Sequence, residues 1–549
     1  MRNTEVRAMP LYAALARNLA DLGVDTMFGV IGDANLFMVD SFVRDCKLRY
    51  IGSAHEAGAV LMALGYAQVS GRVGIATVTH GPGLTNTITA LVEGVKGNIP
   101  LVLLTGDTAE ADSGNPQNVN QREFILATGA GFEQLRTPAS VVEDMTRAYR
   151  RAIVESRPVV LNIPADFNWQ QIDYRQGAYY VAENRALVPS SDDLDNAVGI
   201  LAAARRPIIL AGRGAADPRG RAALVKLAKR TDALLATTLK GRSLFREEDF
   251  AIGVFGTLAT DIANELIFES DCVLAFGASL NRFTTGDGSL LKGKRLIHVD
   301  VAQSQIGKSI CPDAGIVGDV ALTADRMIEL LDLAEIEPSG ARSAALKQKI
   351  ANGAYRAKSS KTHIGGTIDL RYALSRLNEV IPAERVVVQD GGRFMIEAWK
   401  VVEVSDPSAY VHTVNSASIG LGMSEAIGAA AASDQPVLLI TGDGGFMLGG
   451  LSEFNTAVRQ GLDLIVVVCN DGGYGAEYIQ FVRKEMAPSL ATFVWPDFAP
   501  VASSLGGDGL TVRNEADLDV ALEAINRRNR PLLIDLKIDP DSLSEVTIG

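Results

Sequence analysis

The sequence predicts an α/β protein built from three doubly wound domains, each an open sheet between helices. The chain has 549 residues, too many for one hydrophobic core and about enough for three domains of ordinary size. Short apolar runs that end in glycine turns alternate with segments of helical character along the chain, which is typical of doubly wound sheets. No apolar run approaches the roughly 20 residues of a membrane span, so the sequence predicts a soluble protein.

The composition of the chain indicates which classes of partner and which cellular location to expect. The net charge is −13 and no cluster of lysine and arginine exists, which disfavours nucleic acid as a partner. The four cysteines are scattered, with neither metal-ligand spacing nor a disulfide framework. The first residues carry no apolar signal segment, so we expect a cytoplasmic, reducing location.

The first domain, expected over residues 1–185, alternates helix and strand. A helix is expected over Ala8–Leu22, followed by a short strand that breaks into a glycine turn within Thr26–Leu36. The segment Tyr50–Ala59 leads into a second helix. Gly74–Thr79 is expected to be a strand, and His80–Asn86 the glycine turn that opens a third helix.

The middle domain, expected over 186–340, repeats this alternation, with strands within Asp271–Ala278 and over Arg295–Asp300. Its segment Pro207–Ala216 resembles a nucleotide-binding turn, but Gly-x-Gly without a third glycine is a weak signal. Residues 341–362 are expected to be a linker. The third domain, 363–549, begins with a strand and glycine turn over Arg385–Arg393.

A candidate phosphate site lies in the third domain, at Thr441–Phe446. This glycine turn follows the apolar strand Pro436–Ile440 and precedes the expected helix Leu451–Arg459. Glycine lets the backbone approach an anion closely, and the free N–H groups and dipole of a helix N-terminus favour negative charge.

A second apolar run, Leu464–Cys469, ends in Asn470–Gly475. Two parallel strands would bring Asp443 and Asp471 to the same edge of the sheet, where open α/β sheets bind their ligands. Two carboxylates, a loop carbonyl and phosphate oxygens suit Mg²⁺, which prefers hard oxygen ligands. We therefore expect a metal-bridged diphosphate.

These motifs resemble the signature of thiamine diphosphate enzymes related to pyruvate decarboxylase, benzoylformate decarboxylase and acetolactate synthase. The signature is Gly-Asp-Gly, then residues 445–469, then Asn470-Asp471-Gly472-Gly473. The resemblance implies Asp443, Asp471 and the carbonyl of Gly473 as metal ligands. The family usually has Asn where Asp471 stands, and one extra residue lies near Gly449–Gly450, so Asn470 is an alternative ligand that we rank second.

The resemblance also implies the cofactor contacts and names the domains pyrimidine-binding, middle and diphosphate-binding. Glu56 would hydrogen-bond the aminopyrimidine ring and activate the cofactor; alternatively, it only complements a helix dipole. Ile419 would be the apolar wedge that bends the cofactor; alternatively, it is an ordinary core residue. Arg393 would meet a phosphate or be a solvated surface arginine. The diphosphate side would be lined by Gly391, Gly392, Gly444, Gly445 and Tyr474.

In this superfamily the pyrimidine and diphosphate contacts come from two subunits. The resemblance therefore implies a homodimer or homotetramer with active sites at the dimer interface. The acetolactate synthase branch binds FAD in its middle domain and other members bind a different nucleotide or none. The weak Gly-x-Gly turn does not favour FAD or another nucleotide here.

Four positions bear on the reaction. Asp33 and Glu477 fall where pyruvate decarboxylase-like enzymes carry catalytic carboxylates, and His80 falls where benzoylformate decarboxylase-like enzymes carry a catalytic histidine. Gln121 resembles the synthase glutamine that orients substrate, although the Phe that usually precedes it is Asn120. The alternatives are a turn residue for Asp33, a helix cap for His80 and a solvated helix charge for Glu477.

Carboxylates and a histidine around one pocket suit decarboxylation and proton transfer. The sequence thus predicts a thiamine diphosphate- and Mg²⁺-dependent lyase that decarboxylates a 2-oxo acid and either protonates the product or ligates it to a second carbonyl. The alternatives are an acetolactate synthase-like synthase or a C–C bond hydrolase, and, in another class, a catalytically silent cofactor-binding subunit. Intact Glu56, Ile419 and Asp443 argue against the silent subunit.

Overall fold

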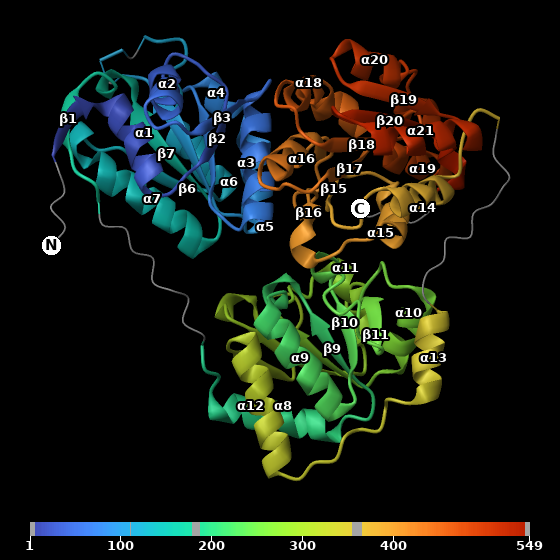
Figure 1. The fold of residues 1–549 in the computed structure, drawn as a ribbon. Helices are drawn as coiled ribbons and strands as arrows, with labels where there is room; N and C mark the ends of the chain where they lie inside the picture. The colour runs from blue at the N-terminus through green and yellow to red at the C-terminus, as the bar shows by residue number, and fades with distance from the viewer. Residues whose placement is uncertain (1–5, 110, 113, 178–186, 354–364, 544–549) are drawn as a thin grey trace. The chain divides into compact units, whose positions relative to one another are not determined.

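The structure, a computed structural model, describes residues 6–109, 111–112, 114–177, 187–353 and 365–543. It confirms three α/β domains, each built on a six-stranded sheet (Figure 1). The chain forms two compact units: residues 1–181, 358–398 and 411–549 make the first, and residues 182–357 and 399–410 make the second. The expected domain boundaries at 185 and 362 lie outside the described residues.

The first domain has the strand order β3-β2-β4-β5-β7-β6, with every neighbouring pair parallel. Its four inner strands are buried along nearly all of their length, as expected where helices cover both faces of a parallel sheet. The elements are β2 (Thr26–Gly29), β3 (Arg49–Gly52), β4 (Gly74–Val78), β5 (Leu101–Asp107), β6 (Gly131–Gln134), β7 (Pro158–Pro164), α1 (Leu11–Asp21), α2 (Leu36–Arg44), α3 (Glu56–Ser70), α4 (Pro82–Thr85), α5 (Ile88–Gly97), α6 (Gln121–Thr128) and α7 (Val141–Glu155).

The helix predicted over Ala8–Leu22 begins later, at Leu11. Residues Arg7–Pro10 form β1, which pairs antiparallel with β8 (Gln171–Tyr174). The reason lies in Pro10, because a proline disfavours the helical conformation in the residue before it and itself suits a helix start.

The third domain has the strand order β16-β15-β17-β18-β20-β19. In chain order this is the arrangement of the first domain: the second strand lies at one edge, next to the first, and the fifth strand lies at the other edge. The elements are β15 (Val386–Gln389), β16 (Tyr410–His412), β17 (Val437–Gly442), β18 (Leu464–Asn470), β19 (Asp508–Val512), β20 (Leu532–Lys537), α14 (Leu370–Val380), α15 (Met395–Val401), α16 (Gly422–Ala431), α17 (Asp443–Gly445), α18 (Leu451–Arg459), α19 (Gly475–Arg483), α20 (Phe498–Ser504) and α21 (Glu515–Arg527).

One turn of π-helix, η8 (Phe446–Gly450), joins α17 to α18. A π turn accommodates one residue more than an α-helical turn. This turn includes Gly449–Gly450, where the sequence predicts one extra residue, and α18 spans Leu451–Arg459 as the sequence predicts.

The middle domain has a different strand order, β11-β10-β9-β12-β13-β14, and all its strand pairs are parallel. The expected linker 341–362 contains helix α13, whose Ile350 packs into the core of this domain. The elements are β9 (Pro207–Ala211), β10 (Leu234–Thr237), β11 (Ala251–Val254), β12 (Cys272–Phe276), β13 (Arg295–Asp300), β14 (Ala314–Val317), α8 (Ser191–Ala203), α9 (Pro218–Thr231), α10 (Asp261–Glu269), α11 (Arg282–Thr285), α12 (Val320–Leu333) and α13 (Ala344–Asn352).

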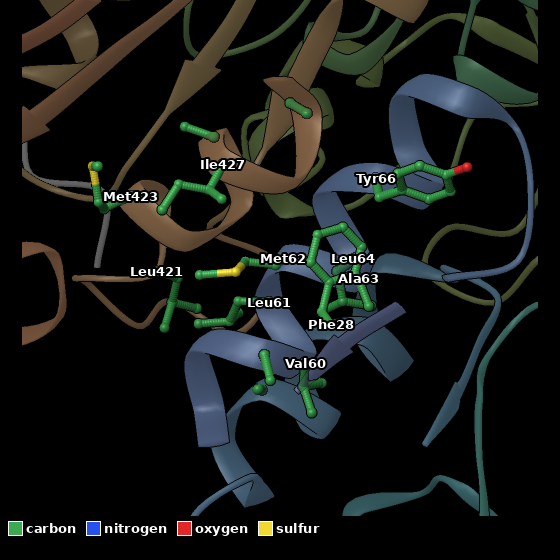
Figure 2. Close-up of a cluster of buried hydrophobic side chains, with 14 of the residues drawn as sticks. Phe28, Val60, Leu61, Met62, Ala63, Leu64, Tyr66, Leu421, Met423 and Ile427 are labelled. Carbon is green, nitrogen blue, oxygen red and sulfur yellow. The ribbon is translucent and has the colours of Figure 1, made fainter. Parts of the chain in front are cut away.

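Within the first unit, the first and third domains share one hydrophobic core. Helices α3 and α16 cross at very short distance, since a Cβ on Gly65 would lie 2.0 Å from the carbonyl oxygen of Glu425. Figure 2 shows Leu61 and Met62 of α3 pointing toward Leu421 and Ile427. Small residues at the crossing therefore let the two domains pack backbone to backbone.

Among the helices of the described residues, none has the length and apolar character needed to cross a membrane.

Candidate cofactor and catalytic site

Asp443 and Asp471 form a close pair of carboxyl groups at one edge of the third sheet. Asp443 follows β17 and Asp471 follows β18, and these strands are parallel neighbours. Burial, and then the charge of Asp443, raise the pKa of Asp471 well above its usual range. Burial raises the pKa of Asp443 as well. Two carboxylates this close repel each other unless a proton or a cation lies between them.

One oxygen of Asp443 already has two hydrogen-bond donors. The backbone N–H of Gly473 and the indole N–H of Trp495 each donate to Oδ2 at 2.8 Å. Asn470, the alternative ligand, instead donates to Asp535 at 2.9 Å and accepts from the N–H of Gly472 at 3.3 Å. Asp471, rather than Asn470, is the side chain that shares the edge with Asp443.

The glycine turn after β17 leaves no room for side chains. A Cβ on Gly444 would lie 2.6 Å from the ring of Tyr474, and one on Gly445 would lie 3.0 Å from Asp390. Glycine is therefore required at both positions. That this turn is a phosphate site stays a prediction of the sequence.

Ile419 is half-buried and lies beside the other glycine loop of the domain. A Cβ on Gly391 would lie 3.1 Å from its side chain. Asp390 ties the two loops together, since it accepts hydrogen bonds from the backbone of Gly391 at 2.7 Å and of Gly420 at 3.1 Å. It also accepts one from the hydroxyl of Thr441 at 3.0 Å. Burial raises the pKa of Asp390 to about 6.

Glu56 is the first residue of α3 in the first domain and is half-buried. Its carboxylate accepts a hydrogen bond from the side chain of Asn86 at 3.0 Å. The residue before it, His55, caps the helix by accepting from the N–H of Ala57. Glu56 is thus held at a helix N-terminus with part of its surface free.

Asp33 and His80 are brought together through Thr79. The Thr79 hydroxyl donates to Asp33 at 2.8 Å and lies 3.4 Å from Nδ1 of His80. Asp33 is exposed, whereas His80 is only 3% exposed. Nε2 of His80 is buried and has no hydrogen-bond partner in the part of the chain that the structure describes.

Gln121 is buried at the start of α6 and contacts the turn that follows His80. Its carbonyl oxygen accepts from the N–H of Gly81 at 2.7 Å, and its amide donates to Gly106 and Asn162. Gly81 has φ +61° and no space for a side chain, because a Cβ there would lie 2.2 Å from the carbonyl oxygen of Gln117. Gln121 also lines a cavity of about 460 Å³ at the carboxyl ends of β5 and β7.

Two further predicted residues are Glu477 and Arg393. Arg393 lies next to Asp471, since a Cβ on Gly475 would lie 2.3 Å from Oδ2 of Asp471 and 3.4 Å from the Arg393 side chain. Glu477 is exposed in the first turn of α19. Arg393 is buried and donates to the carbonyls of Pro540 and Leu543, which contradicts its alternative as a solvated surface arginine.

In the middle domain, the Gly-x-Gly turn serves loop packing. A Cβ on Gly212 would lie 2.0 Å from the carbonyl oxygen of Gly277. Close contact between two turns is thus sufficient to explain these glycines.

Sequence reasoning missed four residues that organise the site: Asp390, Trp495, Glu93 and Glu453. Asp390 carried the same signal as Asp443, a carboxylate between a strand and two glycines. The other three had no local signal, because their partners are 52 to 400 residues away along the chain.

A glycine turn with paired carboxylates on one sheet, and a helix-terminal glutamate on a second sheet of the same topology, define a cofactor-binding enzyme class. The chain belongs to the thiamine pyrophosphate enzyme family. Profiles of that family's N-terminal TPP-binding domain, central domain and C-terminal TPP-binding domain match residues 9–128, 194–327 and 390–536.

Similar proteins include an acetolactate synthase of Mycobacterium bovis, 28% identical over 96% of this chain and 88% of that protein. A probable acetolactate synthase large subunit of Methanococcus aeolicus is 26% identical over 98% and 93%. A probable 2-ketoarginine decarboxylase of Pseudomonas aeruginosa is 29% identical over 92% and 89%. The relatives thus include both synthases and a decarboxylase.

Proposed function

We propose that the protein is a thiamine diphosphate- and Mg²⁺-dependent enzyme that decarboxylates a 2-oxo acid, with ligation of the product to a second carbonyl as a further outcome. The observation that carries the proposal is the close pair of buried Asp443 and half-buried Asp471 beside the glycine turn. A divalent cation would relieve the repulsion between these carboxylates and would bind the diphosphate.

The donors of this edge fit Mg²⁺. Oδ2 of Asp443 accepts from two N–H donors, so Oδ1 would be the oxygen that binds the metal. We assign Asp443, Asp471 and the carbonyl of Gly473 as its protein ligands. The N–H groups of Gly444 and Gly445, the loop Gly391–Gly392 and the ring of Tyr474 would receive the diphosphate.

The organic part of the cofactor would be held by two residues. Glu56 would hydrogen-bond the aminopyrimidine ring, and Asn86 keeps this carboxylate in place. Ile419, half-buried beside Gly391, would be the wedge. When bound, thiamine diphosphate stabilises the carbanion that remains when CO₂ leaves a 2-oxo acid.

The remaining residues would move protons and orient substrate. Nε2 of His80 is a buried nitrogen without a protein partner, so it is available to a reacting group. Asp33 is linked to His80 by the Thr79 hydroxyl and can exchange protons with solvent. Gln121 would orient substrate from the cavity wall, and Glu477 would act from the start of α19.

Because Glu56 and the Asp443–Asp471 pair belong to different domains, we propose a homodimer or homotetramer in which two copies complete each active site. FAD or another nucleotide is not among the cofactors that we propose, because packing is sufficient to explain the glycine turn of the middle domain. We further propose a cytoplasmic location. An acetolactate synthase-like synthase is the second candidate, favoured by the similarity to acetolactate synthases.

The test is to incubate the protein with thiamine diphosphate, Mg²⁺ and a panel of 2-oxo acids that includes pyruvate and 2-ketoarginine. CO₂ release is followed and the carbon product is identified. We expect CO₂ release by the wild type and a loss of roughly 100-fold or more in Glu56→Gln. Glu123→Gln, at an exposed position of α6, serves as the matched control. An aldehyde indicates a decarboxylase and an acetohydroxy acid a synthase. Bound cofactor without CO₂ from any acid would contradict the proposal.

A further inference from the structure

Two buried glutamates link the first and third domains, each reaching into a loop of the other domain. Glu93 on α5 accepts hydrogen bonds from the backbone N–H groups of Asn415 at 2.8 Å and Ser416 at 2.7 Å, and from both of their side chains. Glu453 on α18 accepts from the hydroxyl of Ser53 at 2.7 Å and from the N–H groups of Ala54 and His55. Both carboxylates are buried, at 0% and 1% exposure.

The two links occupy equivalent places, because the two domains share one strand order. In each case the glutamate lies on a helix that follows the third strand of its own domain, β4 or β17. In each case the glutamate carboxylate accepts hydrogen bonds from the loop that follows the second strand of the other domain, β3 or β16.

The crossing of α3 and α16 fixes which residues correspond. Gly65 meets the backbone of Glu425, and Gly428 meets the backbone of Met62, so the crossing is reciprocal. Met62 then corresponds to Glu425 and Gly65 to Gly428. The same correspondence, continued toward the start of each helix, pairs Ser53 with Ser416 and Glu56 with Ile419.

Each linked loop thus leads directly into a residue assigned above to the cofactor. Glu453 holds residues 53–55, immediately before Glu56, and Glu93 holds residues 415–416, shortly before Ile419. We infer that Glu93 is a positioning residue for the wedge Ile419, as Glu453 is for Glu56. This inference rests on the proposed function, because it assumes that Ile419 contacts thiamine diphosphate.

The loop before Ile419 needs the carboxylate of Glu93 because its backbone conformation and its hydrogen-bond donors require support. The loop before Ile419 contains Ala417 at φ +62° and Gly420 at φ +81°, a backbone conformation that needs support. Glu93 supplies a charged acceptor to four donors of this loop, and hydrogen bonds to a charged group are the stronger kind. Without it, the donors would have to find water at a buried interface.

The experiment compares Glu93→Gln with the wild type and with Glu123→Gln, an exposed position on α6 of the same domain. Binding of thiamine diphosphate and of inorganic pyrophosphate, each with saturating Mg²⁺, is measured by calorimetry. The Gln side chain keeps the shape but loses the charge, and its amide NH₂ faces donors where one carboxylate oxygen accepted. We expect thiamine diphosphate affinity to fall roughly tenfold or more, while pyrophosphate, which does not need the wedge, binds as it does to the wild type.

The outcomes distinguish a failure of the proposed function from a failure of the positioning role of Glu93. If the wild type binds neither ligand, the proposed function fails. If Glu93→Gln binds thiamine diphosphate as tightly as the wild type, or loses pyrophosphate to the same extent, the positioning role is wrong. Should Glu93→Gln not fold, Ser416→Ala removes one of the four donors; we expect a several-fold weaker affinity for thiamine diphosphate, and an unchanged affinity would overturn the inference.

Discussion

His80 and Asp443 occupy equivalent positions in two sheets of the same strand order. In the first sheet, Gly29 of β2 pairs with Thr77 of β4, and His80 lies three residues later. In the third sheet, Gln389 of β15 pairs with Ile440 of β17, and Asp443 lies three residues later. Both residues follow the third strand and precede a glycine at the start of a helix.

Their surroundings differ in charge. Asp443 faces a second carboxyl group and uses one oxygen for two N–H donors, so the third domain presents concentrated negative charge that suits a cation. His80 is buried with one nitrogen free and the other next to a hydroxyl that leads to exposed Asp33. The comparison teaches that one strand order can place residues with different neighbours at equivalent sheet edges. Under the proposed function, those neighbours decide between binding a metal and moving a proton.

The largest effect is expected from Asp443→Asn. An amide cannot replace the charge of a metal ligand, so we expect Mg²⁺ affinity and activity to fall by at least about 100-fold, the upper end of the loss seen even for outer-shell partners. Mg²⁺ binding with thiamine diphosphate, measured by calorimetry, checks this. Asp434→Asn, an exposed position just before β17, is the control. If Asp443→Asn bound Mg²⁺ as tightly as the wild type, the charge of Asp443 would not be what distinguishes the edge of the third sheet from that of the first.

Asp471→Asn tests the raised pKa. Because the folded-state pKa of Asp471 is raised, a proton must leave before Mg²⁺ binds, so affinity should rise with pH and fall as pH decreases. The dependence approaches roughly tenfold per pH unit for one displaced proton. Titrations at several pH values should show a flatter dependence in Asp471→Asn, which has no proton to lose. Parallel curves for both proteins would contradict the assignment.

Trp495→Phe removes the indole N–H that donates to Asp443 and keeps a smaller aromatic ring next to Phe493. Loss of such a partner of a metal ligand typically costs about tenfold in affinity. Mn²⁺ binding can be followed by the loss of the free-ion signal in electron paramagnetic resonance. The same substitution at exposed Trp169 should leave binding unchanged, and equal affinities in all three proteins would show that the indole does not hold the carboxylate.

The smallest effect belongs to the first domain. Thr79→Val removes the hydroxyl between Asp33 and His80 but leaves both groups in place. We expect kcat to fall on the order of fivefold, well below the 10²–10⁴ of an acid–base group itself, and its pH profile to shift. Thr89→Val, exposed on α5, is the control. An unchanged pH profile would mean that His80 works independently of Asp33.

Much of the site could be predicted because its signals are local. Asp443 and Asp471 each follow an apolar run and precede glycines, and parallel strands then bring them together. The helix predicted from Ala8 was wrong at its start because Pro10 and a distant strand, β8, decide the conformation of residues 7–10. Trp495 and Glu93 were missed because only the folded chain brings them to Asp443 and Ser416.

The sequence by itself determined the three α/β domains, the glycine turns, and which carboxylates follow strands. These features depend on backbone conformation and on hydrophobic patterns of a few residues. Only the tertiary structure decided that Asp471 rather than Asn470 faces Asp443, that Asp390 joins two loops, and that Glu93 and Glu453 link two domains. Burial, charge coupling and hydrogen-bond partners depend on residues far apart in the chain, and packing alone brings those together.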